Sequence, residues 1–205
     1  MNNKKKDHWE NVFQTKSPDQ VSWTETYPQT SVDFIQAFQL DKNAPIVDIG
    51  GGDSLLVDAL LDLGYTNLSV LDISAKALDR ARQRLGERAE AIHWIENDIL
   101  DFIPTKKYLL WHDRASFHFL TASEEIETYK EIVEKAGVES LVLGTFSTQG
   151  PEKCSGLPVK QYDCKSLANC FSEKFEPMFC EEIQHRTPFE TNQEFIFTRF
   201  KKRIN

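Results

Sequence analysis

The stretch from Ile46 to Tyr65, IVDIGGGDSLLVDALLDLGY, constrains the fold more than any other part of the chain. It contains a short apolar run, a cluster of glycines, and then leucines at helical spacing that end at Gly64. The apolar run predicts a buried strand, and the leucine pattern followed by a glycine predicts an amphipathic helix. The stretch therefore predicts a strand, a tight loop and a helix, which together form the repeating unit of an α/β sheet.

The same alternation recurs along the rest of the chain. Apolar runs predict further parallel strands, and segments at helical spacing follow them, with Ser74, Thr121 and Asp163 as expected helix caps. The predicted parallel strands span 45–50, 67–73, 91–98, 108–113 and 140–147, and two later runs, 178–185 and 194–200, predict an antiparallel pair. This order predicts an α/β fold with a mostly parallel sheet and helices on both of its faces.

The length and composition predict a single domain over residues 1–205. The chain has 205 residues, of which 40% are hydrophobic and 27% charged. We expect an N-terminal helical and aromatic segment over 1–40, with a helix capped by Ser31, and a catalytic core over 41–205. No apolar stretch reaches the length of about 20 residues that spans a membrane, and no apolar segment follows the first lysines. We therefore expect a cytoplasmic protein without a membrane partner.

Charge and cysteine spacing argue against two further kinds of site. The net charge of −8 disfavours a nucleic-acid partner, because phosphate binding needs a basic face. The cysteines show no CxxC spacing, so no metal site is predicted, and we expect reduced thiols at Cys154, Cys164, Cys170 and Cys180. The sequence does not determine the oligomeric state.

The glycine loop is compatible with two kinds of ligand. A dinucleotide loop has the pattern Gly-x-Gly-x-x-Gly, and Gly50 and Gly52 fill its first two places, but Leu55 stands at the third. The carboxylates of Asp48 and Asp53 would also repel a pyrophosphate. A ligand that carries a charged amino group suits these carboxylates better, and a purely structural turn is the alternative.

Polar residues also follow the second and third predicted strands. Asp72 ends the second strand, where a carboxylate can accept hydrogen bonds from both hydroxyls of a ribose. Asn97, Asp98 and Ile99 follow the third strand, where a carboxylate can accept from an adenine amino group while an apolar side chain covers the ring. The alternative for Asp72 is a turn residue before the cap at Ser74, and for the later trio an ordinary turn.

Taken together, this order resembles that of the class I S-adenosylmethionine-dependent methyltransferases, from about Ser31 to Phe200. The resemblance implies a Rossmann-like, seven-stranded, mostly parallel sheet with an antiparallel last strand, and S-adenosyl-L-methionine as the cofactor. Asp48, Gly50 and Gly52 match the first motif of the family, Asp72 its ribose-binding acid, and Asp98 its adenine contact. The predicted cofactor-binding set also includes the neighbouring residues Gly51, Asp53, Ser54, Ile73, Asn97, Ile99 and His112.

The stretch WHDRASFHF after the fourth strand is dense in titratable groups. Asp113 can orient or deprotonate an amine, His118 (or His112) can act as a base near neutral pH, and Arg114 can hold an anionic group. We predict Asp113, Arg114 and His118 as catalytic residues; a structural ion pair and a packed histidine are the alternatives. The stretch also resembles the HDRAxFHFL motif of a group of small bacterial methyltransferases. An asparagine-proline motif is absent here, which argues against methylation of nucleobase amino groups.

The methyl acceptor is the least determined part of the prediction. We predict Trp23, Cys154 and His185 as substrate-binding residues, and the N-terminal aromatic side chains as a lid or as core packing. Because the chain scarcely exceeds a catalytic core, we expect a small-molecule acceptor. The alternatives are a protein lysine or amine methyltransferase, and a non-catalytic cofactor-binding protein of the same fold.

Overall fold

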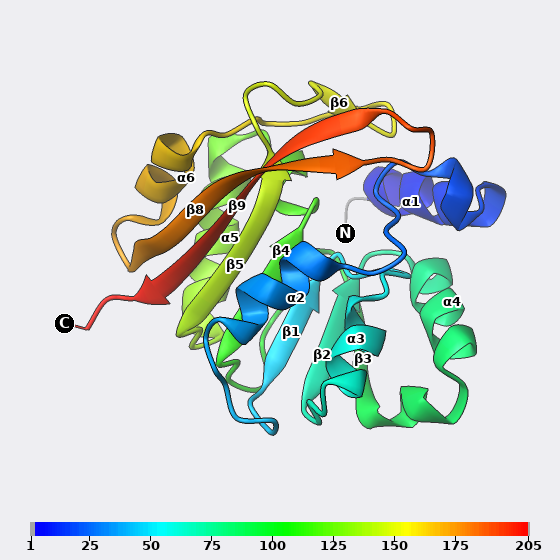
Figure 1. The fold of residues 1–205 in the computed structure, drawn as a ribbon, viewed down its shortest axis with the longest axis horizontal. Coiled ribbons are helices and arrows are strands. Elements are labelled where there is room, and N and C mark those ends of the chain that lie inside the picture. The colour runs from blue at the N-terminus through cyan, green and yellow to red at the C-terminus, as the bar shows by residue number, and fades with distance from the viewer. Residues whose placement is uncertain (1–2, 205) are drawn as a thin grey trace.

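Figure 1 shows the computed structural model of the protein, which describes residues 3–204. A seven-stranded sheet crosses the molecule with the strand order β3-β2-β1-β4-β5-β9-β8. Strands β1 to β5 pair in parallel, and β9 is antiparallel to both β5 and β8, which confirms the predicted sheet. The strands are β1 (Ile46–Ile49), β2 (Leu68–Asp72), β3 (Ile92–Glu96), β4 (Leu110–Arg114), β5 (Ser140–Phe146), β8 (Phe175–Arg186) and β9 (Asn192–Lys202).

Helices cover both faces of the sheet, as predicted. One core contains side chains of α5 (Ser123–Lys135) and α6 (Cys164–Phe171), packed on the face that carries Val47 and Trp111. The other core contains side chains of α2 (Gln29–Gln36), α3 (Leu56–Asp62) and α4 (Ala75–Leu85), packed on the face that carries Ile46 and Leu110. Side chains of a strand alternate between the faces, so neighbouring residues of β4 belong to different cores.

Ser31 does not begin a helix, contrary to the sequence prediction. Helix α2 starts at Gln29 with Pro28 at its N-cap, so Ser31 lies in the first turn and is buried. Helix α5 also begins one residue later than expected, after Ala122. The caps at Ser74 and Asp163 are confirmed, because each side chain accepts a hydrogen bond from the first turn of its helix.

The N-terminal residues form a helix that the sequence analysis did not delimit. Helix α1 (Asn3–Thr15) contains the lysine run, and two of these lysines pair with acids elsewhere: Lys5 with Glu125 and Lys6 with Glu96. In Figure 1, α1 lies beside α4, near the end of the sheet where β1 and β2 end. Short 3-10 turns connect the longer elements: η1 (Pro18–Gln20), η2 (Gly86–Ala91), η3 (Ile99–Asp101) and η4 (Phe117–Phe119).

The cysteines depart from the prediction of reduced thiols. Cys164 at the start of α6 and Cys180 on β8 form a disulfide, whereas Cys154 and Cys170 are free. Cys154 lies in a small hairpin of β6 (Lys153–Cys154) and β7 (Leu157–Pro158). The prediction failed because the two bonded residues are 16 positions apart and are brought together by packing of α6 against β8. Among residues 3–204, no helix has the length and apolar character to cross a membrane.

Candidate active site

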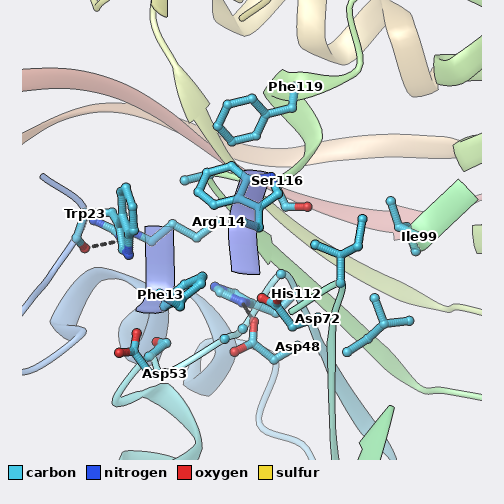
Figure 2. Close-up of a pocket in the computed structure, with 18 of the residues that line it drawn as sticks. Phe13, Trp23, Asp48, Asp53, Asp72, Ile99, His112, Arg114, Ser116 and Phe119 are labelled. Carbon is cyan, nitrogen blue, oxygen red and sulfur yellow. Dashed lines mark hydrogen bonds and ion pairs between the residues drawn. The ribbon is translucent and has the colours of Figure 1, made fainter. Parts of the chain in front are cut away.

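A cavity of about 370 Å³ lies at the carboxyl ends of β1, β2, β3 and β4, the edge where open α/β sheets bind ligands. Figure 2 shows the carboxylates of Asp48, Asp53 and Asp72 on one side of it, with Trp23 and Arg114 beside them. Every residue predicted to bind the cofactor lines this cavity, namely Asp48, Gly50, Gly51, Gly52, Asp53, Ser54, Asp72, Ile73, Asn97, Asp98, Ile99 and His112.

The glycine loop has a backbone that other residues cannot easily adopt. Gly50 and Gly52 have φ angles of 64° and 47°, in the left-handed region. A Cβ on Gly51 would lie 2.6 Å from a carboxylate oxygen of Asp48, and a Cβ on Gly50 would lie 2.6 Å from the Cβ of Ser116. The loop therefore needs glycine both for its turn and for its close approach to neighbouring residues.

Among the carboxylates of this cavity, Asp72 is the one whose pKa burial clearly raises. One oxygen accepts a hydrogen bond of 2.8 Å from the backbone N–H of Ser74, and the other faces Gly52. Burial raises the pKa of Asp72 to about 7; the carboxylates of Asp53 and Asp48 add to the rise, and the Ser74 hydrogen bond opposes it. Asp72 therefore gains or loses its proton near neutral pH.

Asp98 and Ile99 lie together at the end of β3. The Asp98 carboxylate accepts a hydrogen bond of 3.0 Å from Leu100 N–H and so caps η3. Its position in the cavity lining agrees with the ligand-binding prediction, and its capping bond agrees with the structural alternative. The cap leaves further lone pairs of the carboxylate available, so ligand binding by Asp98 stays a prediction.

A buried hydrogen-bonded chain joins three side chains on the cavity wall. His112 Nδ1 lies 2.7 Å from a carboxylate oxygen of Asp48, and Nε2 lies 2.9 Å from the hydroxyl of Ser31. Because the Asp48 carboxylate accepts, Nδ1 donates to it, and Nε2 shares the second hydrogen bond with the Ser31 hydroxyl. The chain fixes the His112 ring between α2 and β1, and it places Ser31, which the sequence analysis treated only as a helix cap, in the site.

Arg114 is the buried cation at the other side of the cavity. Its Nη1 donates a hydrogen bond of 3.0 Å to the carbonyl of Trp23, and its Nη2 lies 3.4 Å from a carboxylate oxygen of Glu25. Burial lowers the pKa of Arg114 from its ordinary value, and the Glu25 carboxylate opposes this effect. Both partners belong to the segment between α1 and α2, so Arg114 attaches that segment to the sheet.

Asp113 does not face the cavity, which corrects the prediction that it contacts a substrate. Its side chain points to the opposite face of the sheet from His112 and Arg114, since strand residues alternate. There it is fully buried and accepts hydrogen bonds from Ser116 N–H, Phe117 N–H and the Tyr129 hydroxyl. Burial raises the pKa of Asp113 to about 6, and these hydrogen bonds oppose the rise. Asp113 shapes the turn that carries the cavity residue Ser116.

His118 is also outside the cavity lining, contrary to its predicted catalytic role. Its ring stacks on Phe146 and its Nδ1 lies 3.4 Å from the Phe146 N–H. Burial lowers the pKa of His118 to about 3, so the ring is neutral at physiological pH. This arrangement is the packed histidine that the sequence analysis held as the alternative.

The predicted substrate residues lie in two neighbouring hollows. Trp23 and Cys154 line the cavity, whereas His185 lines a second hollow on the far side of Arg114. Burial raises the pKa of the Cys154 thiol to about 11, so this thiol is not a nucleophile near neutral pH. Helix α1 contributes Lys5, Trp9 and Phe13 to the cavity; the dense aromatic residues near the N-terminus were the signal for this.

Glu25 and Ser31 are the cavity residues that sequence reasoning missed most clearly. Each lies in the segment before the first strand, where no motif indicates a site. Their only local signal is their proximity in sequence to Trp23, which was predicted to contact a substrate.

Comparison with known proteins agrees with this geometry. Residues 46–135 match the family described as methyltransferase domain. Two curated relatives are named eEF1A lysine and N-terminal methyltransferase: that of Mus musculus is 26% identical over 128 residues, and that of Bos taurus 21% over 127. Each alignment covers 62% of this chain but only 18% of the relative, so the chain corresponds to a small part of those proteins.

Solved structures share the fold over nearly the whole chain. One structure has a TM-score of 0.75 at 17% identity, and the match covers 96% of this chain and 92% of that chain. It is described under the conversion of a disulfide bond into a thioacetal group during echinomycin biosynthesis. A SAM-dependent methyltransferase from Anabaena variabilis has a TM-score of 0.73 at 15% identity, covering 97% and 95%. The N-methyltransferase NodS from Bradyrhizobium japonicum has a TM-score of 0.69 at 16% identity, covering 97% and 100%. The shared fold shows that the chain has the Rossmann-like α/β fold of these methyltransferase structures, and residues 46–135 within it match the methyltransferase domain family.

Proposed function

We propose that the protein transfers a methyl group from S-adenosyl-L-methionine to a small-molecule nucleophile. The observation that carries this proposal is the convergence of Asp48, Asp72 and Asp98 on one cavity beside a glycine loop. Asp48 lies near the end of β1, Asp72 ends β2, and Asp98 follows β3. The cofactor supplies an electrophilic methyl group on a sulfonium when it is bound. The residues present fit it, because carboxylates suited to an amino group and to ribose hydroxyls line one cavity together with the glycine loop.

Each part of the cofactor has a matching group in the cavity. The Asp72 oxygen that does not accept from Ser74 is placed to accept from ribose hydroxyls, and Asp98 with the side chain of Ile99 suits an adenine ring. The carboxylates of Asp48 and Asp53 suit the amino group of the methionine part. His112 holds Asp48 in place through its 2.7 Å contact.

The methyl acceptor belongs on the remaining wall, toward Arg114, Glu25 and Trp23. An acceptor there would approach the reactive methyl from the side opposite the glycine loop, as an in-line displacement needs. We propose that Arg114 touches the acceptor and that Asp113 and His118 act as positioning residues. We also assign the chain to the small bacterial type with the HDRAxFHFL motif, since that motif contains both the cavity residues and the turn behind them.

Protein amine methylation is the second candidate. The name shared by the two curated relatives, eEF1A lysine and N-terminal methyltransferase, favours it. Neighbouring structures favour a small acceptor, since one is described with bound 1,6-didemethyltoxoflavin and S-adenosylhomocysteine and another as the N-methyltransferase NodS.

Calorimetry with S-adenosylhomocysteine and with NAD tests the cofactor. We expect binding of S-adenosylhomocysteine that Asp72→Ala weakens by about tenfold or more, since a buried partner of the ribose hydroxyls is removed. Asp79→Ala on the exposed face of α4 is the matched control and should bind normally. Binding of NAD without binding of S-adenosylhomocysteine would refute the proposal. Tritiated methyl transfer into a cell lysate, fractionated by size, then distinguishes the acceptors: label in small solutes supports the first candidate, and label in protein supports the second.

A further inference from the structure

A second hollow of about 610 Å³ lies directly against the cofactor cavity. The two share Pro18, Thr24, Glu25 and Arg114, which form a wall between them. The glycine loop and the strand-end carboxylates do not line the second hollow; the end of β8, the turn after it and the segment before α2 do. A molecule in this hollow would therefore reach the cofactor cavity at Arg114, from the side opposite the glycine loop.

One nitrogen of the Arg114 guanidinium at this wall makes no hydrogen bond within the part of the chain that the structure describes. Its Nη1 is committed to the Trp23 carbonyl, and Figure 2 shows the side chain extended toward Trp23. Within residues 3–204, its buried Nη2 has no hydrogen-bond partner, and the nearest carboxylate oxygen, on Glu25, is 3.4 Å away. A charge-assisted N–H···O bond is normally about 2.7–2.9 Å long. The guanidinium thus has a buried donor without a close acceptor in the described structure, on a side chain that lines both hollows.

The carboxylate of Glu25 makes only long contacts with basic groups of the described residues. Its side chain is 22% exposed, and within residues 3–204 the other basic group near its carboxylate is His185, whose Nδ1 lies 3.8 Å away. His185 Nε2 donates to the Ser22 carbonyl, and burial together with the charge of Arg114 lowers the pKa of the ring. His185 is therefore a neutral residue that supports the segment. The carboxylate of Glu25 lies 3.4 Å from Arg114 and 3.8 Å from His185, so it can accept a closer cationic partner.

We propose that this wall binds the zwitterionic head of an α-amino acid, with the carboxylate on Arg114 Nη2 and the ammonium on Glu25. Such a ligand replaces one long ion pair by two close ones and leaves the charge of the buried site unchanged. An anion alone would add negative charge beside Glu25 and Asp48, both of which already act on Arg114. A cation alone would draw Glu25 away and leave a buried guanidinium without a close counter-charge, which is costly.

The lining of the second hollow indicates the side chain of this ligand. Apolar side chains of Tyr27, Ile183, Pro188 and Phe197 form part of it. We therefore infer an α-amino acid with an apolar or aromatic side chain. Its role as the methyl acceptor rests on the proposed function, whereas its binding to Arg114 and Glu25 does not.

Calorimetry with three matched probes tests the site: L-phenylalanine, 3-phenylpropanoate, which lacks the amine, and phenethylamine, which lacks the carboxylate. Each is titrated into the full chain with and without saturating S-adenosylhomocysteine. We expect L-phenylalanine to bind and each analogue to bind at least about tenfold more weakly, because each leaves one buried charge unpaired. Equal binding of 3-phenylpropanoate or of phenethylamine, or no binding of L-phenylalanine, overturns the proposal.

Variants locate the probe. We expect Glu25→Gln and Arg114→Met to weaken L-phenylalanine binding by about tenfold or more. Glu131→Gln and Arg88→Met make the same chemical changes in exposed ion pairs with Lys135 and Asp62, away from both hollows, and should leave binding unchanged. An unchanged affinity in Glu25→Gln contradicts the site. If L-phenylalanine binds with these variant effects while S-adenosylhomocysteine does not bind, the proposed function fails and the amino-acid site stands.

Discussion

Burial moves the pH at which the Asp72 carboxyl group ionises. Its pKa rises from an ordinary value of 3.8 to about 7, chiefly because burial disfavours the charge. Below that pH the carboxyl group is protonated in the free protein, and above it the group is an ionised acceptor. A ribose hydroxyl donates more strongly to the ionised form.

We therefore predict that the affinity for S-adenosylhomocysteine increases as the pH rises through about 7. Between about pH 6 and pH 8 we expect a change of up to about fivefold, because a hydrogen bond to a charged group is stronger by roughly 1 kcal/mol than one to a neutral group. Calorimetry over this range measures the effect, and Asp72→Asn, which cannot ionise, should remove it. A wild-type affinity that is the same at both ends of the range would contradict the assignment.

The sign of the accompanying stability change is opposite. Because the folded pKa of Asp72 lies above its unfolded value, its contribution to folding is fully present at low pH and is lost as the pH rises through about 7. The free energy of unfolding of the ligand-free protein, measured relative to Asp72→Asn, should therefore fall over this range.

Helix α1 is the element that covers the cofactor cavity. It contributes Lys5, Trp9 and Phe13 to the lining, and several hydrogen bonds attach it to α4. A carboxylate oxygen of Glu10 accepts a hydrogen bond of 2.7 Å from Ala75 N–H at the N-terminus of α4, and Arg80 donates to the carbonyls of Phe13 and Lys16. A ligand as large as the proposed cofactor cannot enter between α1 and the loop without disturbing these contacts.

We predict that Glu10→Ala accelerates release of S-adenosylhomocysteine. Loss of a helix cap costs about 1 kcal/mol, which corresponds to roughly a fivefold faster dissociation if α1 must open first. Stopped-flow measurement of tryptophan fluorescence gives the rate, since Trp9 and Trp23 line the cavity. The control is Asp7→Ala, an exposed acid on the same helix. Equal rates in Glu10→Ala and wild type would show that α1 does not limit release.

At the scale of the whole molecule, the Cys164–Cys180 disulfide ties α6 to the last pair of strands. It lies apart from the cavity, because neither cysteine lines it. The bond closes a loop of 16 residues, and such a cross-link stabilises the folded chain by about 3 kcal/mol through the restricted unfolded state. The disulfide therefore affects stability without affecting the site directly.

We predict that Cys164→Ser lowers the melting temperature by roughly 10 °C, the shift expected of about 3 kcal/mol in a domain of this size. Differential scanning calorimetry of wild type in oxidising and reducing buffer should show the same difference. Affinity for S-adenosylhomocysteine should be unchanged, and the free thiol variant Cys170→Ser should melt close to wild type. If wild type melts at one temperature in both buffers, the bond makes no such contribution.

The sequence by itself determined the α/β class and the gathering of the predicted cofactor residues around one cavity. Strand and helix periodicity, the glycines and the acids at strand ends are local signals. Parallel strands gather their carboxyl ends at one edge of the sheet, so residues such as Asp48 and Asp72 must meet. The sequence also contained the information that separates Asp113 from Arg114. Consecutive side chains of a strand point to opposite faces of the sheet, so these neighbours of β4 cannot both face the cavity.

Only the tertiary structure decided the contacts between segments far apart in the chain. Ser31 and His112 are 81 residues apart, and Arg114 reaches the Trp23 carbonyl across 91 residues. No local pattern predicts such contacts, because they depend on how α1, α2 and the segment between them pack over the finished sheet. The glycine-loop side of the cavity follows from local periodicity, and the side lined by Trp23, Glu25 and Arg114 follows from packing.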